Sequence, residues 1–170
     1  MAQDTTHQDR FSVKTVVILA LLAAMSIVLE NFLGVNTGQI KIHFGYLPIA
    51  LAGMLYGVLP AVLVAVVADI LSNLSNFNIL FVLLAAMEGA VYGWFLHRRG
   101  GTINRQTLMA VLCQLVISVV IHAGLNTLLL WQLYGLFTPA RFVINAISFP
   151  VKVLTLIILQ RYRPAFEKYA

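Results

Sequence analysis

Five ionisable side chains lie inside the apolar stretches of this 170-residue chain: Glu30, Asp69, Glu88, Arg141 and Lys152. A charge placed in hydrocarbon costs at least roughly 2.5–3.5 kcal/mol on insertion scales. Proteins that retain such residues inside a bilayer generally use them to bind or move something polar. The pattern therefore predicts a protein that binds a polar molecule within the membrane.

The composition places the chain among integral membrane proteins. Hydrophobic residues make up 61% and charged residues 10%, with a mean hydropathy of +0.91, whereas soluble domains have roughly 45–50% apolar and 25% charged residues. We expect an all-α integral membrane fold with a single transmembrane domain over residues 1–170, which begins with a polar N-terminal tail (1–12). No cleavable signal peptide is expected, because the first apolar run is too long for one. The single cysteine, Cys113, excludes an internal disulfide and a cysteine cluster for a metal.

Six apolar segments approach the roughly 20 residues that a membrane-spanning helix needs. They cover residues 13–33, 42–57, 60–76, 78–96, 107–134 and 139–160. If both termini are cytoplasmic, the inner segments collect eight of the eleven basic residues: Arg10, Lys14, Arg98, Arg99, Arg105, Arg161, Arg163 and Lys168. This positive-inside bias predicts six transmembrane helices in one bundle, with cytoplasmic N- and C-termini. The excess positive charge thus reports topology and does not indicate a nucleic-acid surface.

Polar side chains concentrate toward the outer ends of these helices. Asp69 and Asn73 lie on the third segment, and the fifth carries Gln114, Ser118, His122 and Asn126 at four-residue spacing. On the sixth segment, Arg141, Asn145, Ser148 and Lys152 are spaced 4, 3 and 4 residues apart, which places them on one helix face. The arrangement predicts a cup that opens outward above apolar packing, whereas a conducting pore would continue its polar lining to the cytoplasm.

Several of these residues have simpler structural interpretations. Ser72, Gln114 and Ser118 suit interhelical hydrogen bonds, which typically contribute about 0.6 kcal/mol each. His122 suits a histidine that is satisfied within the bundle, and Arg141 could extend its side chain to the headgroups. Lys152 is too deep for that, but an ion pair with Glu88 or Asp69 would account for it.

Small residues at four-residue spacing form a second pattern, because such faces let helix backbones approach closely. Ala20 and Ala24, with Ala23, form one such face on the first segment. Three further pairs repeat the spacing: Gly53 and Gly57, Ala61 and Ala65, and Gly89 and Gly93. We expect the glycine pairs to pack within the bundle, while the alanine face could also bind a partner protein.

These residues carry a resemblance to a known family. The run KIHFGYLPIALAGMLYG from Lys41 to Gly57 resembles the second helix of substrate-binding S components of energy-coupling factor (ECF) vitamin transporters, especially the folate family. The resemblance continues in Ala68-Asp69, in Leu125-Asn126-Thr127 with Tyr134-Gly135 downstream, and in Arg141 followed by Asn145 and Pro150. The alanine face, Ala20 to Ala24, resembles the family's motif for docking on the transmembrane coupling subunit.

The resemblance implies a folate-binding subunit in a prokaryotic cell membrane that is not an enzyme and needs no cofactor or metal. It would bind its vitamin from outside and deliver it inward with a coupling subunit and two cytoplasmic ATPases. This chain has no Gly-x-x-x-x-Gly-Lys phosphate loop of its own.

Folate chemistry suggests roles for ten residues. Asp69, Asn73 and Asn126 could pair with the amino–amide edge of a pterin, and Lys41 and Arg141 with the glutamate carboxylates. Phe44, Tyr46 and Trp131 could stack on the rings. Asn145 and Lys152 complete the predicted substrate-binding set.

The sequence departs from the folate-family pattern at three of these places, so another anionic vitamin such as pantothenate remains an alternative. Ile144 stands where a basic residue commonly precedes the asparagine, and Lys152 where an amide or acid is common. Trp131 comes two positions later than expected. A small secondary transporter or channel is a further alternative. A rhomboid-type protease is not indicated, because this chain lacks the Gly-x-Ser motif that such an enzyme needs.

Overall fold

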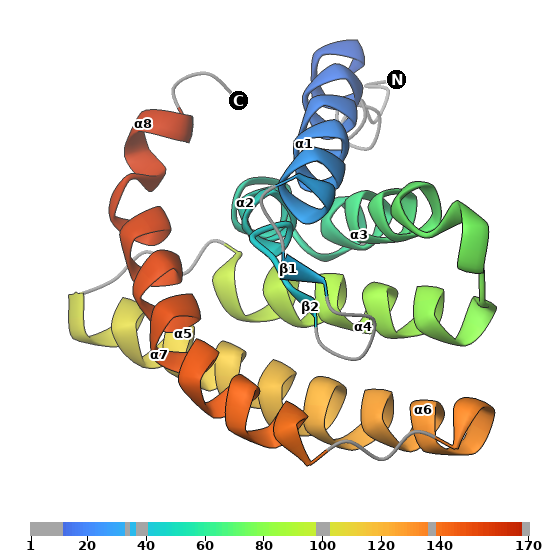
Figure 1. The fold of residues 1–170 in the computed structure, drawn as a ribbon. Helices are drawn as coiled ribbons and strands as arrows, with labels where there is room; N and C mark the ends of the chain where they lie inside the picture. The colour runs from blue at the N-terminus through green and yellow to red at the C-terminus, as the bar shows by residue number, and fades with distance from the viewer. Residues whose placement is uncertain (1–11, 33–34, 37–40, 98–102, 136–138, 168–170) are drawn as a thin grey trace, which may run out of the picture.

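The computed structural model describes residues 12–32, 35–36, 41–97, 103–135 and 139–167. Almost all of this part of the chain is helical, and the longer helices are packed side by side (Figure 1). The elements are α1 (Val13–Asn31), β1 (Val35–Asn36), β2 (Lys41–Ile42), α2 (Tyr46–Tyr56), α3 (Val58–Ser72), the 3₁₀ turn η2 (Leu74–Asn76), α4 (Ile79–Leu96), α5 (Ile103–Val116), the π-helical η3 (Ile117–Asn126), α6 (Thr127–Tyr134), α7 (Ala140–Arg161) and α8 (Arg163–Glu167).

Four helical segments of the described chain are long and apolar enough to cross a membrane: Val13–Asn31, Ile79–Leu96, Asn104–Tyr134 and Phe142–Arg161. Two shorter apolar helices, α2 and α3, lie between the first two of these segments. Much of the apolar surface faces outward, as expected for helices whose environment is lipid. The prediction of an all-helical membrane fold is therefore confirmed.

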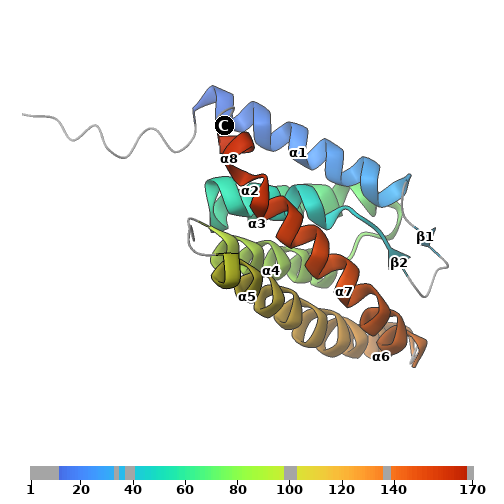
Figure 2. The same ribbon diagram turned by 90° about the vertical axis from the view of Figure 1, so that its left-hand side faces the viewer.

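The helices form layers, with α4 near the middle (Figure 2). α4 packs against α2 and α3 on one side and against α5 and η3 on the other. α1 covers α2 and α3, while α7 crosses α5 and η3 and touches α2. Between α1 and α2 the chain makes a small antiparallel ladder, in which Val35 pairs with Ile42 and Asn36 with Lys41.

The glycine pairs pack inside the bundle, as predicted. A Cβ atom at Gly53 would lie 2.9 Å from the backbone nitrogen of Gly93, and one at Gly89 would lie 2.7 Å from the carbonyl oxygen of Ala61. Glycine at these positions therefore lets α2 and α3 approach α4 at backbone distance. Gly57 serves the connection between α2 and α3, where its positive φ of 96° reverses the chain at little steric cost.

Helix boundaries and regularity differ from the sequence prediction in three places. The segment predicted from residue 42 becomes helical only at Tyr46, because Lys41 and Ile42 pair with β1. The third helix ends at Ser72 instead of residue 76. The fifth begins at Ile103 and contains ten π-helical residues, Ile117–Asn126. Because π-helices bond residue i to i+5, four-residue spacing there does not define one straight face.

Candidate functional site

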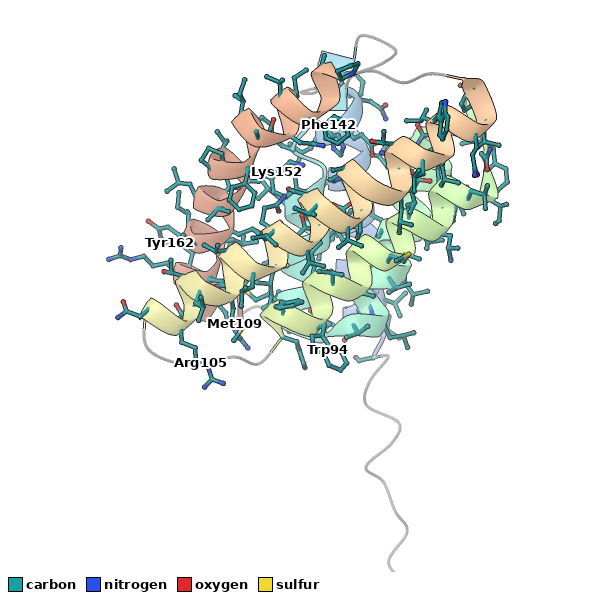
Figure 3. All side chains as sticks on the ribbon, turned by 90° about the horizontal axis from the view of Figure 1, so that it is seen from below. Trp94, Arg105, Met109, Phe142, Lys152 and Tyr162 are labelled. Atoms are coloured by element: carbon teal, nitrogen blue, oxygen red, sulfur yellow. The ribbon has the colours of Figure 1, made fainter. Side chains whose placement is uncertain are left out.

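Lys152 on α7 faces the aromatic ring of Tyr46 at the start of α2. Its ammonium nitrogen lies 5.5 Å from the ring centre, a distance at which a cation is attracted to the face of the ring. The Tyr46 hydroxyl lies 2.7 Å from Thr155 Oγ1, and Thr155 in turn donates to the carbonyl oxygen of Lys152 at 2.8 Å. These contacts join α2 to the middle of α7, where Figure 3 shows Lys152 between the two ends of the bundle.

Glu88 on α4 lies opposite this contact. Its carboxylate Oε2 is 4.0 Å from Nε2 of His122 on η3. The charges of Lys152 and Glu30 also act on Glu88. Of the two acids considered as a partner for Lys152, Glu88 is the one whose charge acts on it. Ionisable side chains from α1, α4, η3 and α7 therefore influence one another, and the positive charge of Lys152 offsets part of the negative charge.

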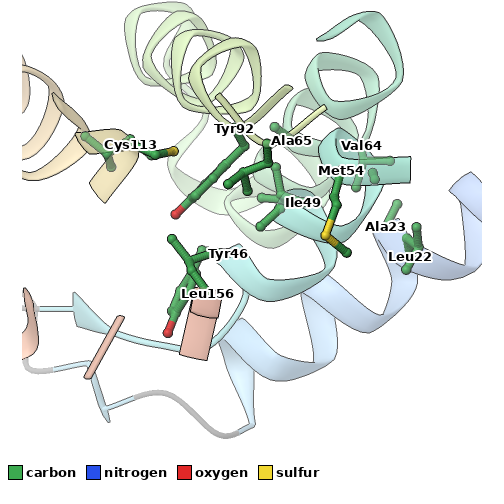
Figure 4. Packing of buried hydrophobic residues seen from close by; sticks show 14 of the residues in the cluster. Leu22, Ala23, Tyr46, Ile49, Met54, Val64, Ala65, Tyr92, Cys113 and Leu156 are labelled. Atoms are coloured by element: carbon green, nitrogen blue, oxygen red, sulfur yellow. The ribbon is translucent and has the colours of Figure 1, made fainter. Parts of the chain in front are cut away.

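Tyr92 lies one helical turn beyond Glu88 on α4 and is fully buried. Its side chain points toward Tyr46 (Figure 4). The Tyr92 hydroxyl interacts with the Glu88 carboxylate, although it completes no hydrogen bond of ordinary geometry within the described part of the chain. It is therefore a second polar group beside Glu88.

Asp69 and Asn73 form a separate pair near the end of α3. Asn73 Nδ2 donates to Asp69 Oδ1 and to the Asp69 carbonyl oxygen, both at 3.0 Å. Nearby, Asn31 on α1 donates to Ser72 Oγ at 3.5 Å. Asn73 is thus a partner of Asp69 at the end of α3, while Lys152 contacts Tyr46 between α7 and α2.

The other predicted residues lie in different environments. Phe44 is exposed, but its ring centre lies 6.4 Å from that of Tyr46. Asn126 ends the π-helical segment and Asn145 lies on α7, both half-buried. Trp131 on α6 is 58% exposed, so it is poorly placed to stack on a ligand held between α2, α4 and α7. Lys41 lies in β2 and Arg141 in the first turn of α7, while their side chains fall outside what the structure describes.

Two of the structural interpretations are also resolved. Gln114 Nε2 donates to Ser118 Oγ at 3.1 Å in a buried position, so this bond runs along one helical segment and not between two helices as predicted. Ala23 is 5% exposed and belongs to the core, whereas Ala20 and Ala24 face outward. Any docking face on α1 is therefore formed by Ala20 and Ala24, and Ala23 packs α1 onto its neighbours.

Sequence reasoning did not assign Glu88, His122 or His43 to the site. Glu88 was counted among the ionisable residues of the apolar stretches and as a partner for Lys152, but neither it nor His43 was given a part of the ligand. The signal for Glu88 was present, because Glu88 is an acid in the middle of an 18-residue apolar helix. The place of His43 depends on the chain entering α2: Gly45 donates to His43 Nδ1 at 3.2 Å, and Ser26 Oγ donates to the Gly45 carbonyl at 2.7 Å.

Comparison with known proteins decides the family. The sequence model described as "ECF-type riboflavin transporter, S component" matches residues 10–161 of this chain. The chain belongs to this family of ECF S components. The family resemblance seen in the sequence is thereby confirmed, and members of the family are transport proteins and not enzymes.

Two similar proteins are named as transporters of folate and not of riboflavin. This chain is 30% identical to the folate transporter FolT of Clostridium novyi (strain NT) over 152 residues, which are 85% of this chain and 86% of that protein. It is 27% identical over 150 residues to the folate transporter FolT of Leuconostoc mesenteroides, 81% of this chain and 79% of the relative. A crystal structure of FolT bound with folic acid superposes with a TM-score of 0.79 at 28% identity, covering 88% of this chain and 95% of that one.

Proposed function

We propose that this S component binds folate from outside the cell. The observation that carries the proposal is the placement of a cation and an aromatic ring together inside the bundle, with Lys152 5.5 Å from the ring centre of Tyr46. Folate carries a flat pterin whose carbonyl oxygen and ring nitrogens accept hydrogen bonds, so the same ring can use both groups. The similarity to FolT proteins, and to a FolT structure containing folic acid, supports this choice.

The chemistry of the site favours folate over riboflavin, although the family model carries the name of riboflavin. Riboflavin has no carboxylate, so it offers no anionic group to Lys41 or Arg141. We assign the folate tail to Lys41 and Arg141, which lie in β2 and in the first turn of α7, and we place Lys152 beside the ring system. Tyr46, with Phe44 beside it, is proposed to contact the ring system.

The proposal includes a membrane topology and partners. The four long apolar segments, with α2 and α3, are taken as six spans of the bacterial cell membrane, with both termini cytoplasmic. Trp94 and Tyr162 are exposed near the proposed inner face, where aromatic side chains favour the interface (Figure 3). Delivery of the vitamin would require a transmembrane coupling subunit and two ATPases, and the exposed alanines Ala20 and Ala24 are the proposed docking residues.

A vitamin panel tests the substrate. The purified full chain in detergent is titrated with folic acid, riboflavin, pantothenate and thiamine, and binding is followed by calorimetry and by fluorescence of Trp94 and Trp131. Tight binding of folic acid alone is expected. Tight binding of riboflavin or pantothenate instead would agree with membership of the S-component family but contradict the assignment of folate as the substrate.

An uptake assay separates this mechanism from that of a small secondary transporter. Cells that express the chain alone should not accumulate folate, and cells that also express the coupling subunit and ATPases should do so at the expense of ATP. Accumulation driven by an ion gradient in the absence of those subunits would contradict the proposal.

A further inference from the structure

We propose that the carboxylate of Glu88 is the specificity-determining group that accepts two hydrogen bonds from the amino–amide edge of a pterin ring. The inference rests on the proposed folate binding and assigns a residue to one part of that ligand. Asp69, Asn73 and Asn126 were the sequence candidates for the same edge, so the structure moves this assignment from α3 to α4.

The first argument is the position of Glu88 on its helix. Leu84, four residues before it, is 8% exposed, and Tyr92, four residues after it, is 0% exposed. Residues four apart lie on the same helix face, so this face of α4 points into the bundle. The Glu88 side chain nevertheless keeps 17% of its surface exposed, and that of His122 opposite keeps 22%. Glu88 therefore lies on the face of α4 that packs against other helices and keeps part of its surface accessible.

The second argument is chemical. The amino–amide edge of a pterin presents two parallel N–H donors, the ring N–H and the 2-amino group, without a net charge. A carboxylate accepts both at once through its two oxygens. Glu88 is suited to this role because the positive charge of nearby Lys152 already offsets its negative charge, so it can bind a neutral edge without adding an uncompensated charge.

The third argument concerns the neighbours of Glu88. Tyr46 provides an aromatic ring that Lys152 approaches from α7, and Tyr92 provides a buried hydroxyl one turn from Glu88 on α4, with which it interacts. A pterin edge bound at Glu88 would therefore lie near a hydroxyl from α4 and an aromatic ring from α2.

The test compares two ligands on the intact chain. Folic acid is compared with the analogue in which a methyl group replaces the 2-amino group, and binding of each is measured by calorimetry in detergent. Loss of a hydrogen bond to a charged group typically weakens binding about tenfold or more. The wild-type chain is therefore expected to prefer folic acid over the analogue by at least about tenfold, and Glu88→Gln to bind both ligands weakly with no preference.

The variants separate this role from a structural one. Glu88→Asp keeps the negative charge near Lys152, but its shorter side chain moves the carboxylate away from the proposed pterin position. This variant should therefore keep the thermal stability of the wild type and lose the preference for folic acid. Asp69→Asn is the competing variant. Retention of the preference in Glu88→Gln, or its loss in Asp69→Asn alone, would overturn the assignment, and so would a wild-type chain that does not distinguish the two ligands.

Failure of the proposed function gives a different result. In that case the wild-type chain binds another vitamin and does not bind folic acid, and both the proposed function and the role of Glu88 are wrong. If folic acid binds but Glu88→Gln leaves its affinity and ligand preference unchanged, the proposed function stands and only the role of Glu88 is wrong.

Discussion

The ammonium group of Lys152 lies 5.5 Å from the centre of the Tyr46 ring, although the two residues are separated by more than a hundred positions in the sequence. The contact brings α7 against the start of α2, and the Tyr46–Thr155 hydrogen bond of 2.7 Å reinforces it. It places the one positive charge predicted deep in the last helix next to an aromatic ring and near the acid Glu88. We therefore expect substrate binding and the docking of α7 to depend on the same few side chains.

Lys152→Met is expected to weaken folate binding and also to destabilise the protein. The methionine removes the cation beside the Tyr46 ring and the positive charge that acts on Glu88. Leaving a buried charge uncompensated typically costs about 3 kcal/mol or more. The double change Lys152→Met with Glu88→Gln should recover much of the thermal stability in detergent while leaving folate affinity low. Recovery of affinity together with stability would show that Lys152 acts only by balancing Glu88.

Arg141→Ala is expected to weaken binding of folate far more than binding of a pterin without the glutamate tail. The residue lies in the first turn of α7, close to the expected outer surface, where a guanidinium can bind a carboxylate through two hydrogen bonds. Affinities for folic acid and for pterin-6-carboxylic acid are the measurement, with Arg105→Ala at the other end of the bundle as a control. Equal losses for both ligands in Arg141→Ala would contradict the tail assignment.

Ala20→Trp and Ala24→Trp are expected to spare folate binding and to block coupled uptake. Both alanines face outward from α1, so a large side chain there obstructs an approaching helix without disturbing the core. Folate affinity of the purified chain and ATP-dependent uptake with the partner subunits are measured in parallel. Ala23→Trp is the matched control, because Ala23 is 5% exposed and its enlargement should overpack the core and reduce stability. If Ala20→Trp also lost folate binding, the alanine face would pack within the bundle.

Gly53→Ala is expected to lower stability by about 1–3 kcal/mol, which is the usual cost of overpacking. The new Cβ atom would lie 2.9 Å from the backbone nitrogen of Gly93, so α2 and α4 would have to separate. Thermal unfolding in detergent measures the effect. Gly124→Ala is the comparison, because the nearest atom to its Cβ would be 3.3 Å away and its cost should be smaller. If Gly53→Ala unfolded at the same temperature as the wild type, the contact between α2 and α4 at Gly53 and Gly93 would not be tight.

Much of the fold could be predicted from the sequence because burial in lipid imposes length and hydropathy on each helix. The long apolar segments, the internal packing of the glycine pairs and the family were all predicted correctly. Helix ends were less predictable. The sequence does not show that Lys41 and Ile42 pair with β1, and no composition signal marks the change to π-helical bonding at Ile117.

The sequence and the tertiary structure determine different features of the candidate site. The sequence by itself determined that acids, bases and amides lie within the apolar helices, since each is a visible exception in an apolar run. It also determined that Lys152 needs an acidic partner. Only the tertiary structure decided that this partner is Glu88 on α4, that Asp69 is paired with Asn73, and that Tyr46 lies against Lys152. The reason is physical: helical periodicity fixes which residues share a face, but the crossing of α2, α4 and α7 fixes which faces meet.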